Sequence, residues 1–202
     1  MARAKISDIR RREIIDAAYR VFSDKGYHKT GIADIAAELE MGHGTLYRYF
    51  KNKLDIASSV IDDVIARVTE VVTAEPAQEI TTVEEYRERL VRIGRRFYDL
   101  LEKNPDAHRI LFYESLNIDE SITRKVNDLF DLFAAMTEAY LQNGIDRGFL
   151  KPETHIREAA YAINAMLFEA ARRLSLAQEI DEDAKKAWSD TIVGIMLDGL
   201  AV

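Results

Sequence analysis

The chain has 202 residues and contains no cysteine. Disulfides, thiol nucleophiles and thiolate metal sites are therefore excluded. It has only three prolines, and no apolar run approaches the roughly 20 residues that a membrane-spanning helix needs. No N-terminal apolar stretch suggests a signal peptide. We therefore expect a soluble, cytoplasmic protein with no membrane partner.

Patterns typical of enzymes and metal sites are missing as well. The four histidines, at positions 28, 43, 108 and 155, are scattered. No H-E-x-x-H, G-x-S-x-G or P-loop pattern occurs, and no spacing of histidines and carboxylates supports a metal ion. The sequence therefore predicts no catalytic residue, no metal site and no cofactor, and it favours a protein that is not an enzyme.

Helical periodicity extends through nearly the whole chain, without an internal repeat or a low-complexity tract. This pattern predicts an all-α fold of about nine helices. Beyond residue 53, helices are expected over residues 54–73, 83–102, 106–115, 120–143, 153–177 and 181–200.

Three further helices are expected in the first 53 residues. Gly26 is placed to end the first helix in the left-handed conformation, and the second helix ends near residues 38–40. A connection of about three residues then leads to the third, as a helix-turn-helix requires. The apolar faces that predict the first two helices are Ile14, Ala18, Val21 and Phe22, then Ile32, Ile35, Ala36 and Leu39.

Residues 41–53, Met-Gly-His-Gly-Thr-Leu-Tyr-Arg-Tyr-Phe-Lys-Asn-Lys, are the most informative segment. At about 100° per residue, Leu46 and Phe50 share one helix face and can dock into a small core. A face of donors, an aromatic ring and a glycine suits the major groove, since glycine lets the backbone approach the duplex closely. That outer face comprises His43, Gly44, Tyr47 and Arg48, and Thr45 and Tyr49 flank it.

An ordered set of residues extends beyond this segment: Phe22, Gly26-Tyr27, Thr30, Ile35-Ala36, Gly44-Thr45-Leu46-Tyr47, Tyr49-Phe50 and Lys53. With this set at the family's spacing, the chain resembles the TetR-type transcriptional repressors over roughly positions 10–56. Two positions depart from the usual pattern of that family, because Glu40 stands where the turn often has glycine and Gly42 stands where a serine usually caps the recognition helix. Gly42 can still act as an N-cap, but one hydroxyl that could contact phosphate is lost.

The charge distribution supports nucleic-acid binding independently of the motif. Up to residue 53 the chain carries 11 Lys and Arg against 7 Asp and Glu, whereas the remainder carries 17 against 28. The net charge is thus +4 in the first part and −11 in the second, and the local charge is what matters for DNA. We also expect a basic arm ahead of the first helix, or else a solvated terminus, formed by Arg3, Lys5, Arg10, Arg11 and Arg12.

Roles within the head follow from chemistry and position. Base-edge contacts are predicted for His43, Thr45 and Tyr47, although His43 could instead be an inert exposed residue. Phosphate contacts are predicted for Arg48, Tyr49 and Lys53, although Tyr49 could be a core ring. Either Thr30 or Gly31 caps the second helix, and Thr30 could add a phosphate bond. The predicted DNA-binding set is Thr30, Gly42, His43, Gly44, Thr45, Tyr47, Arg48, Tyr49 and Lys53.

We predict a helix-turn-helix DNA-binding domain over residues 1–53 and a ligand-binding and dimerisation domain over residues 54–202. The last two helices carry more apolar surface than one core requires. This excess favours a homodimer built on a four-helix bundle over packing within a monomer, as the resemblance also implies. The interface candidates are Ala162, Met166, Ile192, Ile195 and Met196.

Aromatic residues of the middle helices predict a ligand pocket, although such stripes are more often plain core. Polar residues beside an apolar helix need partners, which a ligand, a symmetry mate or the backbone could supply. The resemblance implies a small apolar effector, an acyl chain or a drug-like molecule. The candidates are Phe97, Leu101, Phe112, Tyr113, Phe130, Phe133, Met136, Tyr140, Asn164, Phe168 and Arg172.

Together these patterns predict a homodimeric repressor that binds a pseudo-palindromic double-stranded DNA operator and is released by a small lipophilic effector. The resemblance implies that ligand shifts the helix that starts near Lys53 and so changes the separation of the two heads. Two alternatives stay open. One is a constitutive helix-turn-helix DNA-binding protein without an effector. The other is a helical ligand-binding domain with weak DNA binding, against which Tyr47, Tyr49 and Lys53 argue.

Overall fold

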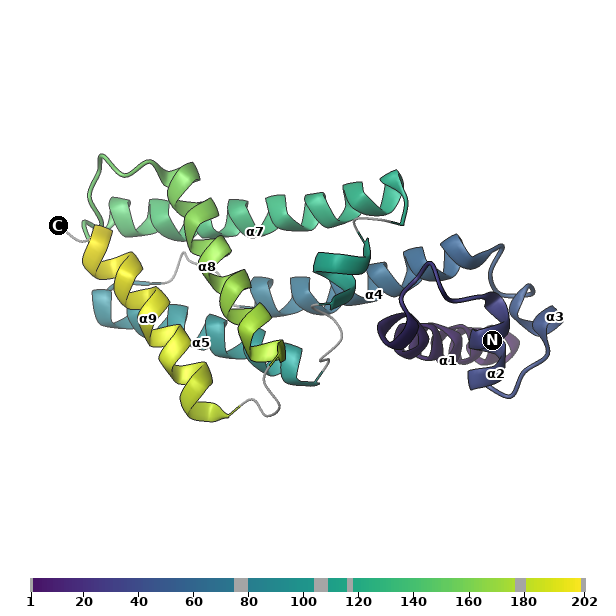
Figure 1. Cartoon of the computed structure of the whole chain (residues 1–202). Helices are drawn as coiled ribbons and strands as arrows, with labels where there is room; N and C mark the ends of the chain where they lie inside the picture. Colours follow the sequence, from purple (N-terminus) through teal and green to yellow (C-terminus); the bar gives the residue numbers. More distant parts are fainter. Residues whose placement is uncertain (1, 75–79, 104–108, 116–117, 177–180, 201–202) are drawn as a thin grey trace. The chain divides into compact units, whose positions relative to one another are not determined.

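The computed structural model describes residues 2–74, 80–103, 109–115, 118–176 and 181–200 (Figure 1). Within these ranges the chain forms eight α-helices and one π-helical turn. The all-α fold predicted from periodicity is therefore confirmed, and five of the helices predicted beyond residue 53 have counterparts with slightly different ends. Of the helix predicted over residues 106–115, residues 106–108 lie outside the described residues, and Ile110–Glu114 form a π-helical turn. The elements are α1 (Ala2–Lys25), α2 (Ile32–Glu38), α3 (His43–Leu46), α4 (Lys53–Thr73), α5 (Val83–Lys103), η2 (Ile110–Glu114), α7 (Glu120–Asp146), α8 (Ile156–Leu176) and α9 (Glu182–Leu200).

The chain divides into two compact units. Unit 1 comprises Met1–Ala66 and Asp106–Val126, and unit 2 comprises Arg67–Pro105 and Asn127–Val202. Helices α4 and α7 each contribute residues to both units. The predicted functional boundary at residue 53 lies within unit 1, because the first part of α4 and the η2 segment belong to the same compact unit as the helix-turn-helix.

The core of unit 1 consists of the apolar faces that periodicity predicts. Helices α1, α2 and α3 pack against one another through them, and removing this surface from water is the main favourable term in folding. The buried residues, each at most 8% exposed, include Ile14, Ala18, Val21, Phe22, Ile35, Ala36, Leu46 and Phe50.

Two turns of unit 1 use the left-handed backbone conformation. Gly26 ends α1 with φ of 80°, as predicted, and its N–H donates to the Phe22 carbonyl at 2.9 Å. Glu40 adopts φ of 51° in the turn between α2 and α3. This conformation favours glycine and costs a residue with a Cβ about 1–2 kcal/mol, which explains physically why glycine suits this position.

The expectation of a basic arm ahead of the first helix is wrong. Helix α1 begins at Ala2 and therefore includes Arg10, Arg11 and Arg12. Arg12 forms an ion pair with Asp63 of α4, and the hydrogen bond from its guanidinium to that carboxylate raises the pKa of Arg12. Arg12 and Arg11, which donates to Ser59, link α1 to α4 within unit 1, whereas Arg10 pairs with Glu13 inside α1.

In unit 2, helices α5, α8 and α9 pack together (Figure 1). Tyr86 of α5 is fully buried, and its hydroxyl donates to the Tyr140 carbonyl at 2.7 Å. Leu141, Leu150 and Val193 are at most 5% exposed in the same cluster. None of the helices in the described residues combines the length and the apolarity that a bilayer span requires.

Candidate nucleic-acid interface and internal cavity

The segment from Gly42 to Phe50 has one buried edge and one exposed edge. Leu46 is 1% and Phe50 is 3% exposed, whereas Tyr47 is 56% exposed. Helix α3 ends at Leu46, and a turn closed by bonds from Tyr49 N and Phe50 N to the Leu46 carbonyl continues it. The remaining residues follow the prediction, with Gly42, His43, Gly44 and Arg48 exposed and Thr45 and Tyr49 half-buried.

The two glycines of this segment are not required by packing within the chain. Gly42 is the N-cap of α3 without a side-chain bond, as predicted, and its carbonyl accepts from Thr45 N at 2.9 Å. A Cβ added to Gly42 or Gly44 would meet no described atom within 4 Å. The bare backbone at Gly44 therefore lies open on the exposed edge, where a duplex could approach closely.

Arg11 supports the recognition segment from the inner side. Its guanidinium donates to the Tyr49 carbonyl and to Ser59 Oγ, both at 2.9 Å, and lies 4.2 Å from the centre of the Phe50 ring. One side chain thus joins α1, the end of the recognition segment and α4. No sequence pattern indicates this contact, because the partners are 38 and 48 residues away.

Lys53 supports the loop between α1 and α2. Its ammonium donates to the Tyr27 carbonyl at 3.0 Å and to the Thr30 carbonyl at 2.9 Å, and lies 4.1 Å from the centre of the Tyr27 ring. Two of its three N–H groups are thus engaged within unit 1. These bonds give the side chain a positioning role, and its phosphate contact stays a prediction.

Thr30 likewise has an internal role. It is 2% exposed, and its hydroxyl donates to the Gly26 carbonyl at 2.8 Å, so the predicted phosphate bond needs correction. Gly31 is the N-cap of α2, and Asp34 accepts from its N–H at 2.7 Å. The loop between α1 and α2 is therefore stabilised by hydrogen bonds from its own side chains and from Lys53.

Glu114, at the end of η2, holds the same loop from another element. Its carboxylate accepts from Tyr27 N at 3.0 Å, and Arg109 lies 3.8 Å from the carboxylate. A Cβ at Gly26 would be 3.3 Å from Glu114 Oε2, so this close approach depends on glycine. The contact spans 87 residues of sequence and could not be found from periodicity.

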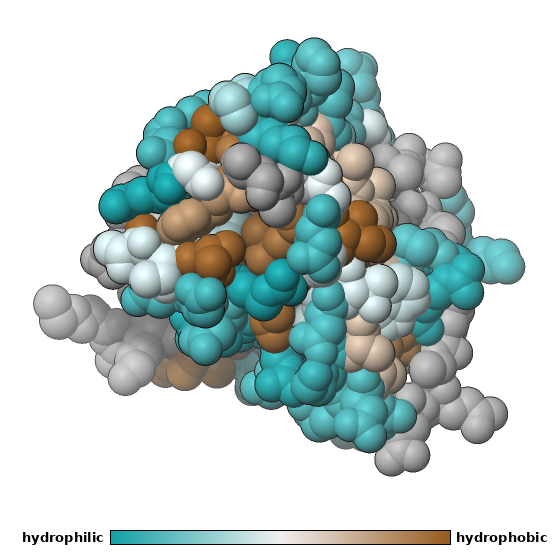
Figure 2. All heavy atoms as spheres, turned by 90° about the vertical axis from the view of Figure 1, so that its left-hand side faces the viewer, coloured by the Kyte–Doolittle hydropathy of each residue, from teal (hydrophilic) through white to brown (hydrophobic). Residues whose placement is uncertain are grey.

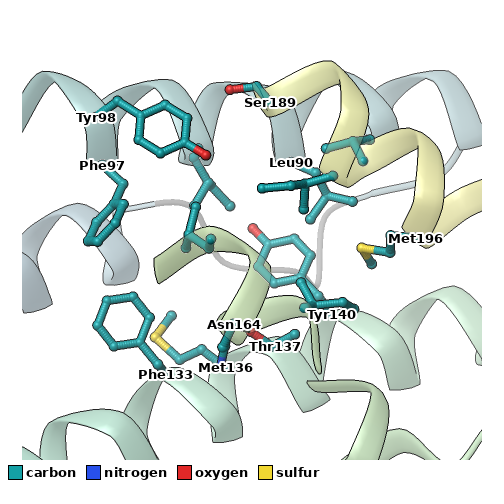
Figure 3. A pocket seen from close by; sticks show the side chains of 16 residues that line it. Leu90, Phe97, Tyr98, Phe133, Met136, Thr137, Tyr140, Asn164, Ser189 and Met196 are labelled. Atoms are coloured by element: carbon teal, nitrogen blue, oxygen red, sulfur yellow. Dashed lines mark hydrogen bonds between the residues drawn. The ribbon is translucent and has the colours of Figure 1, made fainter. Parts of the chain in front are cut away.

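Unit 2 contains a cavity of about 90 Å³ between α5, α7, α8 and α9 (Figure 3). Five predicted ligand residues line it: Phe97, Phe133, Met136, Tyr140 and Asn164. Its other lining residues, which sequence analysis missed, are Leu90, Ile93, Gly94, Tyr98, Thr137, Ile163, Leu167, Ser189, Ile192, Val193 and Met196.

Four predicted ligand residues, namely Leu101, Phe130, Phe168 and Arg172, are not among the described residues that line this cavity. Leu101 is buried, and Phe168 packs beside Phe133 with ring centres 5.3 Å apart and beside Phe130 at 5.2 Å. Arg172 binds Glu169 with two bonds of 2.7 Å. The hydrogen bonds from Arg172 and Arg173 lower the pKa of Glu169 to about 2. The side chains of Phe112 and Tyr113 lie outside the described residues.

Some polar groups of the cavity wall have hydrogen-bond partners, and others have none among the described residues. Thr137 Oγ1 donates to Asn164 Oδ1 at 2.9 Å, and Ser189 Oγ donates to the Lys185 carbonyl at 2.9 Å. Asn164 Nδ2 and the Tyr98 hydroxyl have no hydrogen-bond partner among the described residues. Burial raises the pKa of Tyr98, so its phenol stays protonated.

Beside the cavity, Lys185 of α9 is 1% exposed and donates to three carboxylates. These are Asp99 at 2.8 Å and Glu102 at 2.7 Å, both on α5, and Glu182 at 2.7 Å. Burial alone would lower the pKa of Lys185, but these bonds raise it above its usual value. The ammonium sits where the three carboxylates converge, so the cluster is an ion-pair link between α5 and α9.

The outer faces of α8 and α9 carry only part of the predicted dimer interface. Ala162 is exposed, Met166 is half-buried and Ile195 is 54% exposed. Ile192 and Met196 are 7% and 3% exposed and line the cavity, so their assignment to the interface needs correction. Figure 2 shows the end of the molecule where α9 lies, with apolar side chains gathered between hydrophilic ones.

Comparison with known proteins agrees with the geometry of the head. Residues 14–60 match the family described as "Bacterial regulatory proteins, tetR family". The chain is 27% identical over 154 residues to the "Fatty acid metabolism regulator protein" of Bacillus subtilis, which covers 75% of this chain and 76% of that protein. It is 28% identical over 195 residues to the regulator TtgR of Pseudomonas putida, covering 90% and 88%.

Solved structures show the same fold over nearly the whole chain. The crystal structure of the regulator FadR from Bacillus subtilis in complex with stearoyl-CoA superposes with a TM-score of 0.71 at 23% identity, covering 93% of this chain and 98% of that one. The fatty acid degradation regulator FadR from Bacillus halodurans gives a TM-score of 0.77 at 22% identity, covering 94% and 95%. The helix-turn-helix head matches the tetR family over residues 14–60, and head and fold together are those of a TetR-type transcriptional regulator.

Proposed function

We propose that the chain is a homodimeric repressor whose affinity for a pseudo-palindromic operator is lowered by a small apolar effector. DNA binding is assigned to residues 1–53, and effector binding and dimerisation to residues 54–202. A dimer with twofold symmetry presents two heads to two half-sites, which is how short recognition helices in this class of protein achieve specificity.

The exposed edge of the recognition segment is the observation that carries this proposal. His43, Thr45 and Tyr47 are assigned to base edges, where an imidazole, a hydroxyl and an aromatic ring can read the major groove. Arg48 and Tyr49 are assigned to phosphates, and the bare backbone at Gly42 and Gly44 allows the close approach. Leu46 and Phe50 anchor the opposite edge in the core.

Lys53 and Thr30 are assigned to positioning. Their bonds fix the loop that precedes α2 and the start of α4, and precise placement of a recognition segment requires rigid support. The charge of Lys53 still adds to the positive potential of the head, because its acceptors are neutral carbonyls.

Dimerisation is assigned to the exposed faces of α8 and α9, including Ala162, Met166 and Ile195. Small and apolar residues on adjacent helices allow close helix packing between subunits, and such faces are typical of isologous four-helix interfaces. Burial of these side chains in a second copy would remove their apolar surface from water.

The effector site is assigned to the cavity of unit 2. The chain is similar to regulators of fatty acid metabolism and to a structure that contains stearoyl-CoA, which supports an effector with an acyl chain. The cavity of about 90 Å³ is smaller than an engineered cavity of about 150 Å³ that binds benzene. Ligand must therefore select a wider arrangement of the wall, and flexible methionines such as Met136 and Met196 can permit it.

This need to widen the cavity supplies a physical basis for allostery. A ligand that fits only the wider state shifts the population towards it, and α4 has residues in both units that such a shift can move. If the two heads of the dimer are wrongly spaced for the two half-sites in the wider state, ligand binding and operator binding oppose each other. A coupling free energy of roughly 1–3 kcal/mol changes operator affinity by about 5–150-fold.

The test begins with selection of genomic fragments by the purified protein at about physiological salt, followed by sequencing. We expect a pseudo-palindrome that a dimer binds, and Tyr47→Ala should relax specificity at one base step of each half-site, at a cost of about 1–3 kcal/mol. Recovery of no specific sequence would favour the alternative of a ligand-binding domain with weak DNA binding.

Fluorescence anisotropy of the recovered operator, titrated with butanoyl-, octanoyl- and stearoyl-CoA, then tests the effector. We expect one chain length to weaken binding, and calorimetry should show that operator weakens binding of that thioester by the same factor, because coupling is reciprocal. Operator affinity that no acyl compound changes would favour a constitutive DNA-binding protein.

A further inference from the structure

Two deeply buried side chains in the cavity wall each have a hydrogen-bond donor without an acceptor among the described residues. Asn164 is 4% exposed and Tyr98 is 1% exposed. Neither Asn164 Nδ2 nor the Tyr98 hydroxyl has a hydrogen-bond partner among the described residues. Buried polar groups in native proteins are almost always bonded, so each exception requires an explanation.

The Asn164 amide is held in one orientation. Thr137 Oγ1 of α7 donates to Asn164 Oδ1 at 2.9 Å, which engages the acceptor end of the amide and leaves the nitrogen as its donor end. Figure 3 shows Tyr98 on α5 with its hydroxyl turned towards the interior, and Asn164 beside Thr137 on the other side of the cavity. The wall therefore presents donors from two helices.

The rest of the wall is uncharged and mostly apolar, with hydroxyl groups only on Thr137, Tyr140 and Ser189 among the described lining residues. None of the described residues that line the cavity carries a charge. Ser189 already donates to the Lys185 carbonyl, and the Lys185 ammonium itself is engaged by three carboxylates. A carboxylate or phosphate placed in this cavity would lose its hydration without gaining a counter-charge.

We infer that the part of the effector that enters this cavity is uncharged and carries a carbonyl-type oxygen, which accepts hydrogen bonds from Asn164 Nδ2 and the Tyr98 hydroxyl. Ketones, esters, lactones and thioesters have this chemistry, whereas a free carboxylate and a plain hydrocarbon do not. The inference rests on the proposed effector function and specifies the chemical class that the cavity selects.

Small matched probes need the least widening of this cavity. Acetophenone and ethylbenzene share one carbon skeleton and differ by the carbonyl oxygen, and benzoate adds the negative charge. Because the ketone is better hydrated than the hydrocarbon, the informative quantity is the ratio of their affinities, compared between wild type and variants. This comparison cancels the difference in hydration.

The variants remove one donor each in the full-length chain. Tyr98→Phe deletes the hydroxyl alone, and Asn164→Leu replaces the amide by an apolar group of similar shape. Tyr161→Phe is the matched control, since Tyr161 is on the surface of α8, 43% exposed and outside the cavity wall. Dissociation constants are measured by calorimetry or by ligand-observed NMR. If Asn164→Leu fails to fold, Tyr98→Phe alone decides.

We expect each cavity variant to lower the ratio of acetophenone to ethylbenzene affinity by roughly fivefold, the value of one hydrogen bond of ordinary strength. Tyr161→Phe should leave the ratio unchanged, and benzoate should bind wild type at least about tenfold more weakly than acetophenone. An unchanged ratio in the cavity variants, or benzoate binding as tight as acetophenone, would overturn the inference and leave the proposed function intact.

Absence of binding by all three probes would also overturn the inference. The operator titration with acyl thioesters then shows whether the effector function fails with it. A thioester that still releases operator would leave that function standing, whereas no response would remove both.

Discussion

The two units hold their supporting cations in opposite ways. In unit 1, Lys53 donates to two backbone carbonyls, and Arg11 donates to a carbonyl and a serine hydroxyl. In unit 2, Lys185 donates to three carboxylates. Neutral acceptors satisfy the hydrogen bonds of a cation without cancelling its charge, whereas the carboxylates around Lys185 more than cancel it.

This difference explains how the head keeps a positive field while folding around its own lysine and arginine. Charges within about 8 Å still act on a phosphate at physiological ionic strength, so a cation with an internal role can still favour DNA. The first 53 residues carry a net charge of +4 and the remainder −11. Lys53 and Arg11 thus keep their full charge in the head, although other cations there, such as Arg12, pair with carboxylates.

Lys185→Met should give the largest effect. Removing the ammonium leaves three carboxylates close together and unpaired, and breaking a buried ion pair typically costs 3–5 kcal/mol. The carboxylates are 46–73% exposed and stay hydrated, so we expect a loss of about 3 kcal/mol in the free energy of unfolding, measured by urea denaturation.

The neighbouring Lys186 provides the control for that variant. It is 60% exposed and pairs with Asp190 one turn away, and such surface pairs contribute less than about 1 kcal/mol. Lys186→Met should therefore change stability little. Equal losses in the two variants would show that Lys185 does not link α5 and α9.

A comparison of Lys53→Met with Arg48→Met tests whether each cation of the head stabilises the fold or contacts DNA phosphate. The Lys53→Met variant lacks the two hydrogen bonds that the charged ammonium donates. At a half-buried site this loss should lower the free energy of unfolding by about 1–2 kcal/mol. Arg48 is exposed, so its loss should leave stability within about 0.5 kcal/mol and instead reduce the salt dependence of operator binding by about one counterion per half-site.

Thermal melts and operator affinities over a range of salt concentrations separate these two roles. The sequence alone predicts the phosphate role for both residues, and the structure separates them. A Lys53→Met protein with wild-type stability and a flattened salt dependence would restore the phosphate role of Lys53.

Gly44→Ala tests whether the exposed edge of α3 needs bare backbone. Alanine favours helices over glycine by about 1 kcal/mol, and a Cβ there meets no described atom, so stability should stay the same or rise slightly. Operator affinity should fall by roughly tenfold, since the methyl group would separate the backbone from the duplex. Gly199→Ala, where a Cβ also meets nothing within 4 Å, is the control; unchanged operator binding by Gly44→Ala would place Gly44 away from DNA.

The sequence predicted the head better than the cavity, for a physical reason. Helix periodicity decides which side of a short helix is buried, and it placed Leu46, Phe50 and Tyr47 correctly. The internal bonds of Lys53 were missed because its acceptors are backbone carbonyls, which every residue carries and no motif marks. Glu114 was missed because its partner lies 87 residues away.

In unit 2, periodicity identified apolar helix faces without separating their contacts. Ile192 and Ile195 both belong to the apolar stripe of α9, yet one lines the cavity and the other is exposed. Lys185 and Lys186 are adjacent and chemically identical, and only the packing of α9 on α5 makes one of them buried. Such distinctions depend on tertiary packing, which pattern alone does not encode.

The smallest expected effects come from two tyrosines on α5, one with a hydrogen-bond partner and one without a partner among the described residues. Tyr86 and Tyr98 are 0% and 1% exposed, and burial raises the pKa of both. The Tyr86 hydroxyl donates to the Tyr140 carbonyl, whereas the Tyr98 hydroxyl has no partner among the described residues. Tyr86→Phe should therefore lower the free energy of unfolding by about 1–2 kcal/mol, because a buried carbonyl loses its donor.

Tyr98→Phe should instead leave the free energy of unfolding unchanged or raise it by about 0.5–1 kcal/mol, since it removes a buried hydroxyl that has no acceptor. Urea denaturation of both variants without ligand measures the difference. A gain in stability joined to weaker ketone binding would mean that the chain sacrifices stability for recognition at this position. A loss as large as that of Tyr86→Phe would mean that the Tyr98 hydroxyl is already satisfied within the folded chain and is not a donor held for a ligand.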